Sequence, residues 1–141
     1  MNRVLVDTGP LVASLSEQDE HHEICVAALK ELSTLLLTCW PVITEAAWLL
    51  SNDPEAVDRL LQSVSKGFLQ VLPVIGGEAD KIAKLLSRYR NLRPQIAHAM
   101  LVYLAHRENI RTIFTLDQRD FSVYRTAKKL PFRLVPELRT K

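Results

Sequence analysis

The chain has 141 residues, of which 48% are hydrophobic and 24% are charged. This length supports one domain with a sizeable core, and the composition is that of an ordinary globular protein. With only 4 glycines and 7 prolines, long disordered linkers are excluded, and we expect a single domain over residues 1–141.

The net charge of +2 is distributed unevenly along the chain. Residues 1–70 hold 4 basic and 10 acidic side chains, a net of −6, whereas residues 71–141 hold 14 basic and 6 acidic ones, a net of +8. Two interpretations stay open: the C-terminal half meets an anionic partner, or the two halves pair with each other across the fold.

Short apolar runs alternate with helical patterns along the chain. Runs rich in β-branched and apolar residues predict strands at 3–7, 35–39, 68–74, 111–116 and 132–135. Apolar residues at helical spacing predict helices at 11–16, 20–32, 41–50, 54–66, 77–90 and 94–107. This alternation implies βαβ units, and therefore an α/β fold with a mostly parallel central sheet and helices on both faces.

Two apolar segments have to be considered as targeting or membrane segments. The N-terminal run is interrupted by Asp7, which a signal peptide would not contain. The run at 34–52 contains Glu45, and a carboxylate inside a bilayer is costly. We therefore expect a cytoplasmic protein with no membrane partner, in which Cys25 and Cys39 are small buried residues of a reducing compartment.

Three apolar segments each contain one isolated carboxylate. Asp7 and Asp117 follow predicted strands, and Glu45 lies inside an apolar helix. An acid in an apolar segment costs stability unless it is paired or bound to a metal. Taken singly, the first two could cap turns. Glu45 could pair with an arginine such as Arg119.

Taken together, the three carboxylates favour one shared site. Sites in open α/β sheets gather at the carboxyl ends of the strands, where Asp7 and Asp117 are predicted to lie. Clustered carboxylates repel one another, and a hard divalent cation such as Mg²⁺ or Mn²⁺ offsets their charge. Such ions activate water and stabilise charge on a phosphate, so the cluster indicates metal-assisted phosphodiester hydrolysis.

The segments around these acids resemble the motifs of the PIN domain family. LVDTGPLVASL resembles the opening of a PIN domain, and PVITEAAWLL has its glutamate where the family has a second acid. The segment RTIFTLDQRDFSVYR resembles the closing motif of VapC-like PIN toxins. The resemblance covers nearly the whole chain and implies a PIN-like three-layer α/β/α sandwich.

By this resemblance, the chain is a VapC-like toxin that uses Mg²⁺ or Mn²⁺ to cleave RNA. Its catalytic and metal-binding acids would be Asp7, Glu45 and Asp117. The hydroxyls of Thr8 and Thr115 would support these acids. A second metal ion is not predicted.

One position departs from the family's pattern, because His98 stands where the third acid is usual and Gln95 replaces a neighbouring acid. A neutral imidazole can still bind a metal, and would shift the preference from Mg²⁺ toward Mn²⁺ or Zn²⁺. A protonated His98 would instead pair with Asp7 or Asp117 in place of the metal. A hydrogen-bonded core histidine is a third interpretation.

Two functions therefore stay open: an active ribonuclease, or a degenerate PIN module that binds RNA or a partner protein without cleavage. Because VapC-like toxins are typically encoded beside an antitoxin and commonly dimerise, the resemblance also implies a cognate antitoxin protein and a homodimer. Asp120 could belong to the site or only cap the turn before Phe121. Basic side chains that could line a groove for an RNA backbone, or simply be solvated, are Arg88, Arg90, Arg93, Arg107, Arg111, Arg119, Arg125, Lys128 and Lys129.

Overall fold

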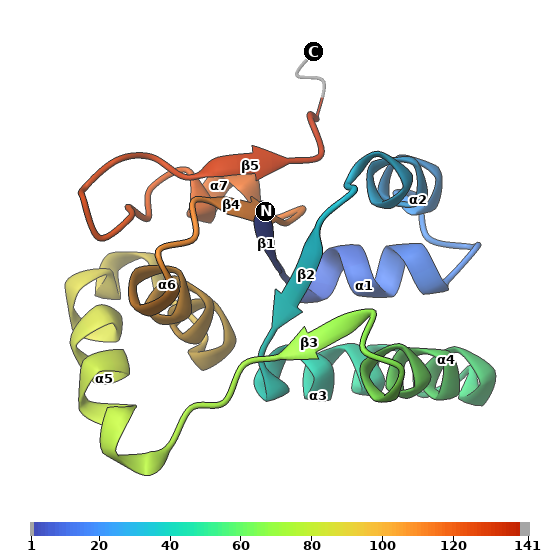
Figure 1. The fold of residues 1–141 in the computed structure, drawn as a ribbon, viewed down its shortest axis with the longest axis horizontal. Helices are drawn as coiled ribbons and strands as arrows, with labels where there is room; N and C mark the ends of the chain where they lie inside the picture. The colour runs from blue at the N-terminus through green and yellow to red at the C-terminus, as the bar shows by residue number, and fades with distance from the viewer. Residues whose placement is uncertain (1, 139–141) are drawn as a thin grey trace.

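A five-stranded parallel sheet forms the centre of the protein in the computed structural model, which describes residues 2–138 (Figure 1). The strand order is β3-β2-β1-β4-β5, so β1 lies in the middle. The strands are β1 (Arg3–Val6), β2 (Leu35–Thr38), β3 (Leu69–Val71), β4 (Thr112–Phe114) and β5 (Arg133–Val135). The predicted α/β fold class with a mostly parallel sheet is confirmed.

Helices cover both faces of this sheet. They are α1 (Thr8–Leu15), α2 (His22–Glu31), α3 (Trp40–Leu49), α4 (Pro54–Ser65), α5 (Ala79–Arg88), α6 (Ile96–Glu108) and α7 (Gln118–Phe121), with short 3₁₀ turns at Gly76–Glu78 and Arg90–Leu92. Figure 1 shows α1, α2 and α4 on one side of the strands and α5 and α6 on the other. The predicted three-layer sandwich is therefore present.

Two helices differ from the pattern expected from the sequence. Helix α1 begins at Thr8 rather than near Leu11, because Asp7 serves as its N-cap. Helix α7 has only four residues, which is too short to give a periodic signal. Helix α4 ends as predicted at Gly67, which adopts the left-handed conformation with a φ of 83°.

The central strands and α6 form the most buried part of the molecule. Strand β1 is buried along 4–6, and α6 is buried along 101–105 on nearly all sides. The hydroxyl of Thr38 at the end of β2 donates a 2.8 Å hydrogen bond to the carbonyl of Val6. The carboxyl ends of β1 and β2 and the helix carrying His98 are therefore held in a rigid frame.

Both cysteines are buried free thiols, as predicted. Burial raises the pKa of Cys25 to about 11, and the charge of Asp19 adds to the increase. Burial also raises the pKa of Cys39 to about 12, and the charge of Asp7 contributes. Both thiols are therefore neutral near pH 7. Among residues 2–138, no helix has both the length and the apolar character required to span a bilayer.

Candidate functional site

Asp7 occupies the turn between β1 and α1, and it is 3% exposed. Its backbone N–H donates to the carbonyl of Phe114 in β4 at 2.9 Å. The carboxylate Oδ1 accepts the backbone N–H of Thr8, and Oδ2 accepts the hydroxyl of Thr115, both at 2.8 Å. The Asp7 carboxylate is therefore fixed between the ends of β1 and β4.

Asp117 is held by the same threonine. The Thr115 hydroxyl, which donates to Asp7, also accepts the backbone N–H of Asp117 at 3.0 Å. Asp117 caps α7, because its Oδ1 accepts the backbone N–H of Asp120 at 3.3 Å. Through these two hydrogen bonds Thr115, which is completely buried, connects the turns that carry Asp7 and Asp117.

His98, in the first turn of α6, lies between these two aspartates, and its side chain is 12% exposed. Its Nε2 is 3.2 Å from Oδ2 of Asp7, and its Nδ1 is 3.9 Å from Oδ2 of Asp117. Each aspartate therefore uses Oδ1 for capping and turns Oδ2 toward the imidazole. Both aspartates therefore cap a helix, as one interpretation predicted, and both also face His98, while a shared catalytic site stays a prediction.

Asp120 belongs to the same cluster. One ligand-type atom each from His98, Asp117 and Asp120 lies within 4.8 Å of the others. Asp120 does not cap the turn before Phe121, because its backbone N–H is the donor to the Asp117 cap. The three-residue spacing between Asp117 and Asp120 was the available signal, since such a spacing on a helical turn places both side chains on one side.

The charges of these acids control the protonation of His98. Burial alone lowers the pKa of His98, but the hydrogen bond to Asp7 and the charges of Asp7, Asp117 and Asp120 raise it, and the net pKa is raised. The imidazolium form is therefore stabilised in the metal-free site. Of the three interpretations of His98, this direction favours a protonated imidazole that pairs with Asp7 in the metal-free protein.

We expect the stability of the metal-free protein to depend on this histidine. Because the folded-state pKa of His98 lies above its ordinary value of about 6.5, its contribution to stability is complete below that value and is lost as the pH rises through the folded-state pKa. Thermal unfolding in EDTA between about pH 6 and about pH 9 measures this loss. If the stability of a His98→Asn variant declines with pH in the same way, the pH dependence belongs to another group.

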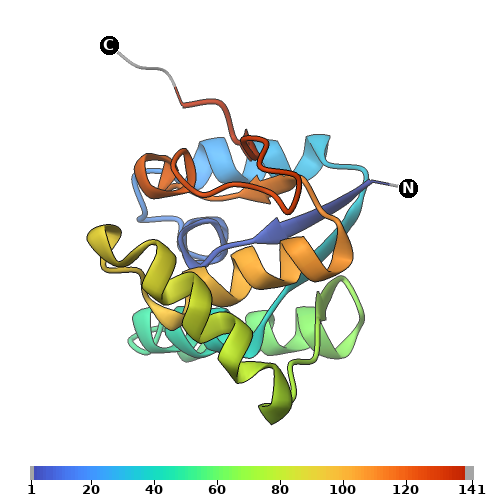
Figure 2. The ribbon, with the colours of Figure 1, turned by 90° about the vertical axis from the view of Figure 1, so that its left-hand side faces the viewer.

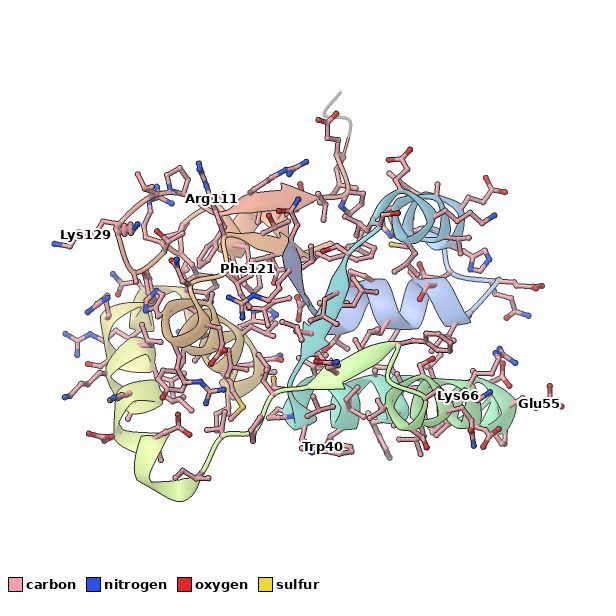
Figure 3. The ribbon with its side chains drawn as sticks, in the orientation of Figure 1. Trp40, Glu55, Lys66, Arg111, Phe121 and Lys129 are labelled. Atoms are coloured by element: carbon pink, nitrogen blue, oxygen red, sulfur yellow. The ribbon has the colours of Figure 1, made fainter. Side chains whose placement is uncertain are left out.

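Aromatic side chains fix the orientation of His98. The imidazole packs edge-on against Phe121 at a centroid distance of 4.9 Å, and Phe121 packs against Tyr124 at 5.0 Å. Phe121 is completely buried between the strand ends and α6 (Figure 3). Tyr124 is 1% exposed, and burial raises its pKa, with further increases from the charges of Asp120 and Asp117. The cluster is therefore backed by a rigid apolar wall.

Glu45 is not joined to this cluster by any contact. It lies half-buried on α3, and within residues 2–138 no ion pair or side-chain hydrogen bond involves it, so the alternative pairing with Arg119 is absent. Helix α3 nevertheless follows directly after its N-cap residue Cys39, whose pKa is raised by burial and also by the charge of Asp7. Membership of Glu45 in the site stays a prediction.

The donor set fits a divalent metal ion. Carboxylate oxygens of Asp117 and Asp120 together with one imidazole nitrogen suit Mn²⁺ at least as well as Mg²⁺, and Asp7 lies at the other imidazole nitrogen. The hydroxyl of Thr8, next to Asp7, is buried and has no hydrogen-bond partner among the described residues. Buried unpaired hydroxyls normally find a water or a ligand, so this atom also indicates that a polar species binds here.

A model of the PIN domain family matches residues 4–129. The chain belongs to the PIN domain family. It is 26% identical over 135 residues to the protein Ribonuclease VapC26 of Mycobacterium tuberculosis, an alignment that spans 94% of this chain and 100% of that protein. The crystal structure of VapC20 from Mycobacterium tuberculosis, a toxin that cleaves the sarcin-ricin loop, has the same fold. It superposes with a TM-score of 0.72 at 15% identity and covers 78% of this chain and 86% of that one. The predicted resemblance to VapC-like members of the family is confirmed.

Proposed function

We propose that this PIN-domain protein is a VapC-like toxin endoribonuclease that hydrolyses RNA phosphodiester bonds with the help of a divalent metal ion. The observation that carries the proposal is the convergence of Asp7, Asp117 and Asp120 on His98 at the carboxyl ends of β1 and β4. The similarity to Ribonuclease VapC26 supports the same reaction. Neither the cluster nor the comparisons favour the alternative of a PIN module that does not cleave.

In this proposal Asp7 and Asp117 would hold the metal ion, and Glu45 would supply a further acid. His98 in its neutral form would be a nitrogen ligand. The hydroxyls of Thr8 and Thr115 support the acids, and Thr115 keeps Asp7 Oδ2 directed toward the imidazole. A bound Mg²⁺ or Mn²⁺ would lower the pKa of water and stabilise the charge that develops on the phosphate.

The partners that we propose are RNA, a cognate antitoxin that covers the site, and a second copy of the chain. Trp40, labelled in Figure 3, is 55% exposed on α3, and Trp48 on the same helix is 76% exposed. Exposed aromatic side chains of this kind are enriched at interfaces, which supports a homodimer. Sedimentation velocity measures whether the protein is a monomer or a dimer. The buried thiols of Cys25 and Cys39 fit a cytoplasmic location, and we propose one PIN domain over residues 1–141.

We expect the purified protein to cleave structured RNA in Mn²⁺, more slowly in Mg²⁺, and not at all in EDTA. Because the metal binds only the native state, a concentration of 100 times its Kd stabilises the protein by about 2.7 kcal/mol, which thermal unfolding detects. RNA binding with no cleavage and no metal-dependent stabilisation would support the non-cleaving alternative and overturn this proposal.

A further inference from the structure

A groove with a basic rim lies between α5 and α6, away from the acidic cluster. It encloses about 340 Å³. Its polar lining comes from Lys81, Lys84 and Arg88 of α5 and from Tyr103, His106 and Arg107 of α6. The function proposed for the acidic site uses none of these side chains.

The three cations of α5 are not compensated by acids. Lys81, Lys84 and Arg88 are exposed, and none of the ion pairs among residues 2–138 involves them. Their spacing of three and four residues places them on one side of the helix, over a length of about 10 Å. Several nitrogen-tipped side chains project from this helix in Figure 3. The rim therefore presents a row of three free positive charges.

The wall formed by α6 is held rigidly. Arg107 forms a 2.9 Å ion pair with Glu78 and donates a 2.8 Å hydrogen bond to the carbonyl of Pro73. The hydroxyl of Tyr103 also donates to Glu78, and the Nε2 of His106 lies 2.7 Å from the carbonyl of Arg125. Because Arg107 is already neutralised, the charge available to a ligand comes from α5.

A stack of aromatic side chains links the C-terminal end of α5 to the acidic site. Tyr89, which follows Arg88, packs against Tyr124 at 4.9 Å and so joins the aromatic stack that ends on His98. Figure 2 shows the end of α5 beside the start of α6, where His98 lies. The C-terminal end of α5, where Arg88 lies, is therefore the end of the groove from which a bound strand would continue toward the acidic cluster.

We propose that this groove binds the phosphate backbone of the RNA on which the acidic site acts, an inference that rests on the proposed function. Lysine and arginine side chains in a row neutralise successive phosphates of a nucleic acid strand without reading its sequence. An acidic protein segment is the competing ligand. The aromatic stack that links the end of α5 to His98 favours RNA, because a phosphodiester strand has to reach the proposed cleavage site.

The test compares wild type with a Lys81→Gln, Lys84→Gln, Arg88→Gln variant. A matched control, Lys30→Gln, Lys66→Gln, Arg133→Gln, removes three exposed charges elsewhere. Fluorescence anisotropy measures the binding of a single-stranded RNA oligonucleotide in EDTA at several salt concentrations. Circular dichroism verifies that both variants fold.

We expect the groove variant to bind RNA at least about tenfold more weakly at low salt. The slope of log affinity against log salt should fall by about 2, because each single-strand phosphate contact contributes about 0.7. The control should stay within about twofold of wild type. If the two variants have equal RNA affinity and an equal slope of log affinity against log salt, the proposal that this groove binds RNA is wrong.

The outcomes separate the two proposals. If wild type binds RNA through the groove but cleaves none in Mn²⁺ or Mg²⁺, the proposed function fails and the groove stands. If the groove variant binds RNA like the control but no longer binds poly-glutamate, the groove recognises an acidic protein segment and the RNA proposal is wrong.

Discussion

Replacing Asp7 with asparagine is expected to reduce RNA cleavage by at least about 100-fold. Asparagine keeps the size of aspartate and one side-chain oxygen, so it can still accept the backbone N–H of Thr8 that caps α1. It removes the negative charge that faces His98 at 3.2 Å and that a metal ion would require. The variant should therefore still fold, with a loss of metal binding and cleavage and, in the metal-free protein, a loss of the stability that the His98–Asp7 pair contributes.

Steady-state cleavage of a labelled RNA and the metal-induced shift in unfolding temperature measure these two effects. Asp58→Asn is a matched control, because Asp58 is exposed on α4 and forms no hydrogen bond or ion pair with another described residue. Both variants should fold, and the control should cleave like wild type. Full cleavage by Asp7→Asn would remove Asp7 from the site and with it the proposed mechanism.

The position of Asp7 could be predicted because its charge is isolated in an apolar segment. The same signal identified Asp117, and both now lie at strand ends beside His98. Asp120 was ambiguous, because an acid near a turn is more often a cap than a ligand. The structure of α7 shows that Asp117 caps this helix and that the Asp120 carboxylate lies near the imidazole of His98.

Other features depend on contacts that no sequence pattern encodes. The alternation of strands and helices predicted the sandwich, since each element carried its own periodic signal. The link from Thr115 to both Asp7 and Asp117 required β1 and β4 to be neighbours, and that pairing crosses 108 positions of the chain. The aromatic stack behind His98 likewise joins α5, α6 and α7.

Replacing His98 with aspartate is expected to increase cleavage in Mg²⁺ and to tighten Mg²⁺ binding by about tenfold. An aspartate oxygen reaches about as far as the imidazole Nδ1, which lies 3.9 Å from Asp117 Oδ2. The space now filled by Nε2, 3.2 Å from Asp7 Oδ2, would become free beside a third carboxylate. Oxygen ligands suit Mg²⁺ better than imidazole does, so the preference for Mn²⁺ should decrease.

The same variant should be less stable than wild type when metal is absent. It replaces a cation that pairs with Asp7 by an anion near Asp7, Asp117 and Asp120, and like charges at this distance repel. Thermal unfolding in EDTA measures the stability of the metal-free variant. The increase in its unfolding temperature on adding Mg²⁺ should exceed the increase in wild type. His98→Asn is the matched control, because it removes the imidazole without adding a charge.

Two results would contradict this account of His98. If His98→Asp and His98→Asn both lose activity in every metal, the imidazole itself performs a step that a carboxylate cannot. If both variants unfold like wild type in EDTA at every pH, the contact with Asp7 contributes nothing to stability. The expected pattern is more activity in His98→Asp alone and a loss of metal-free stability in both variants that is larger in His98→Asp, and it would mean that the imidazolium stabilises the metal-free site.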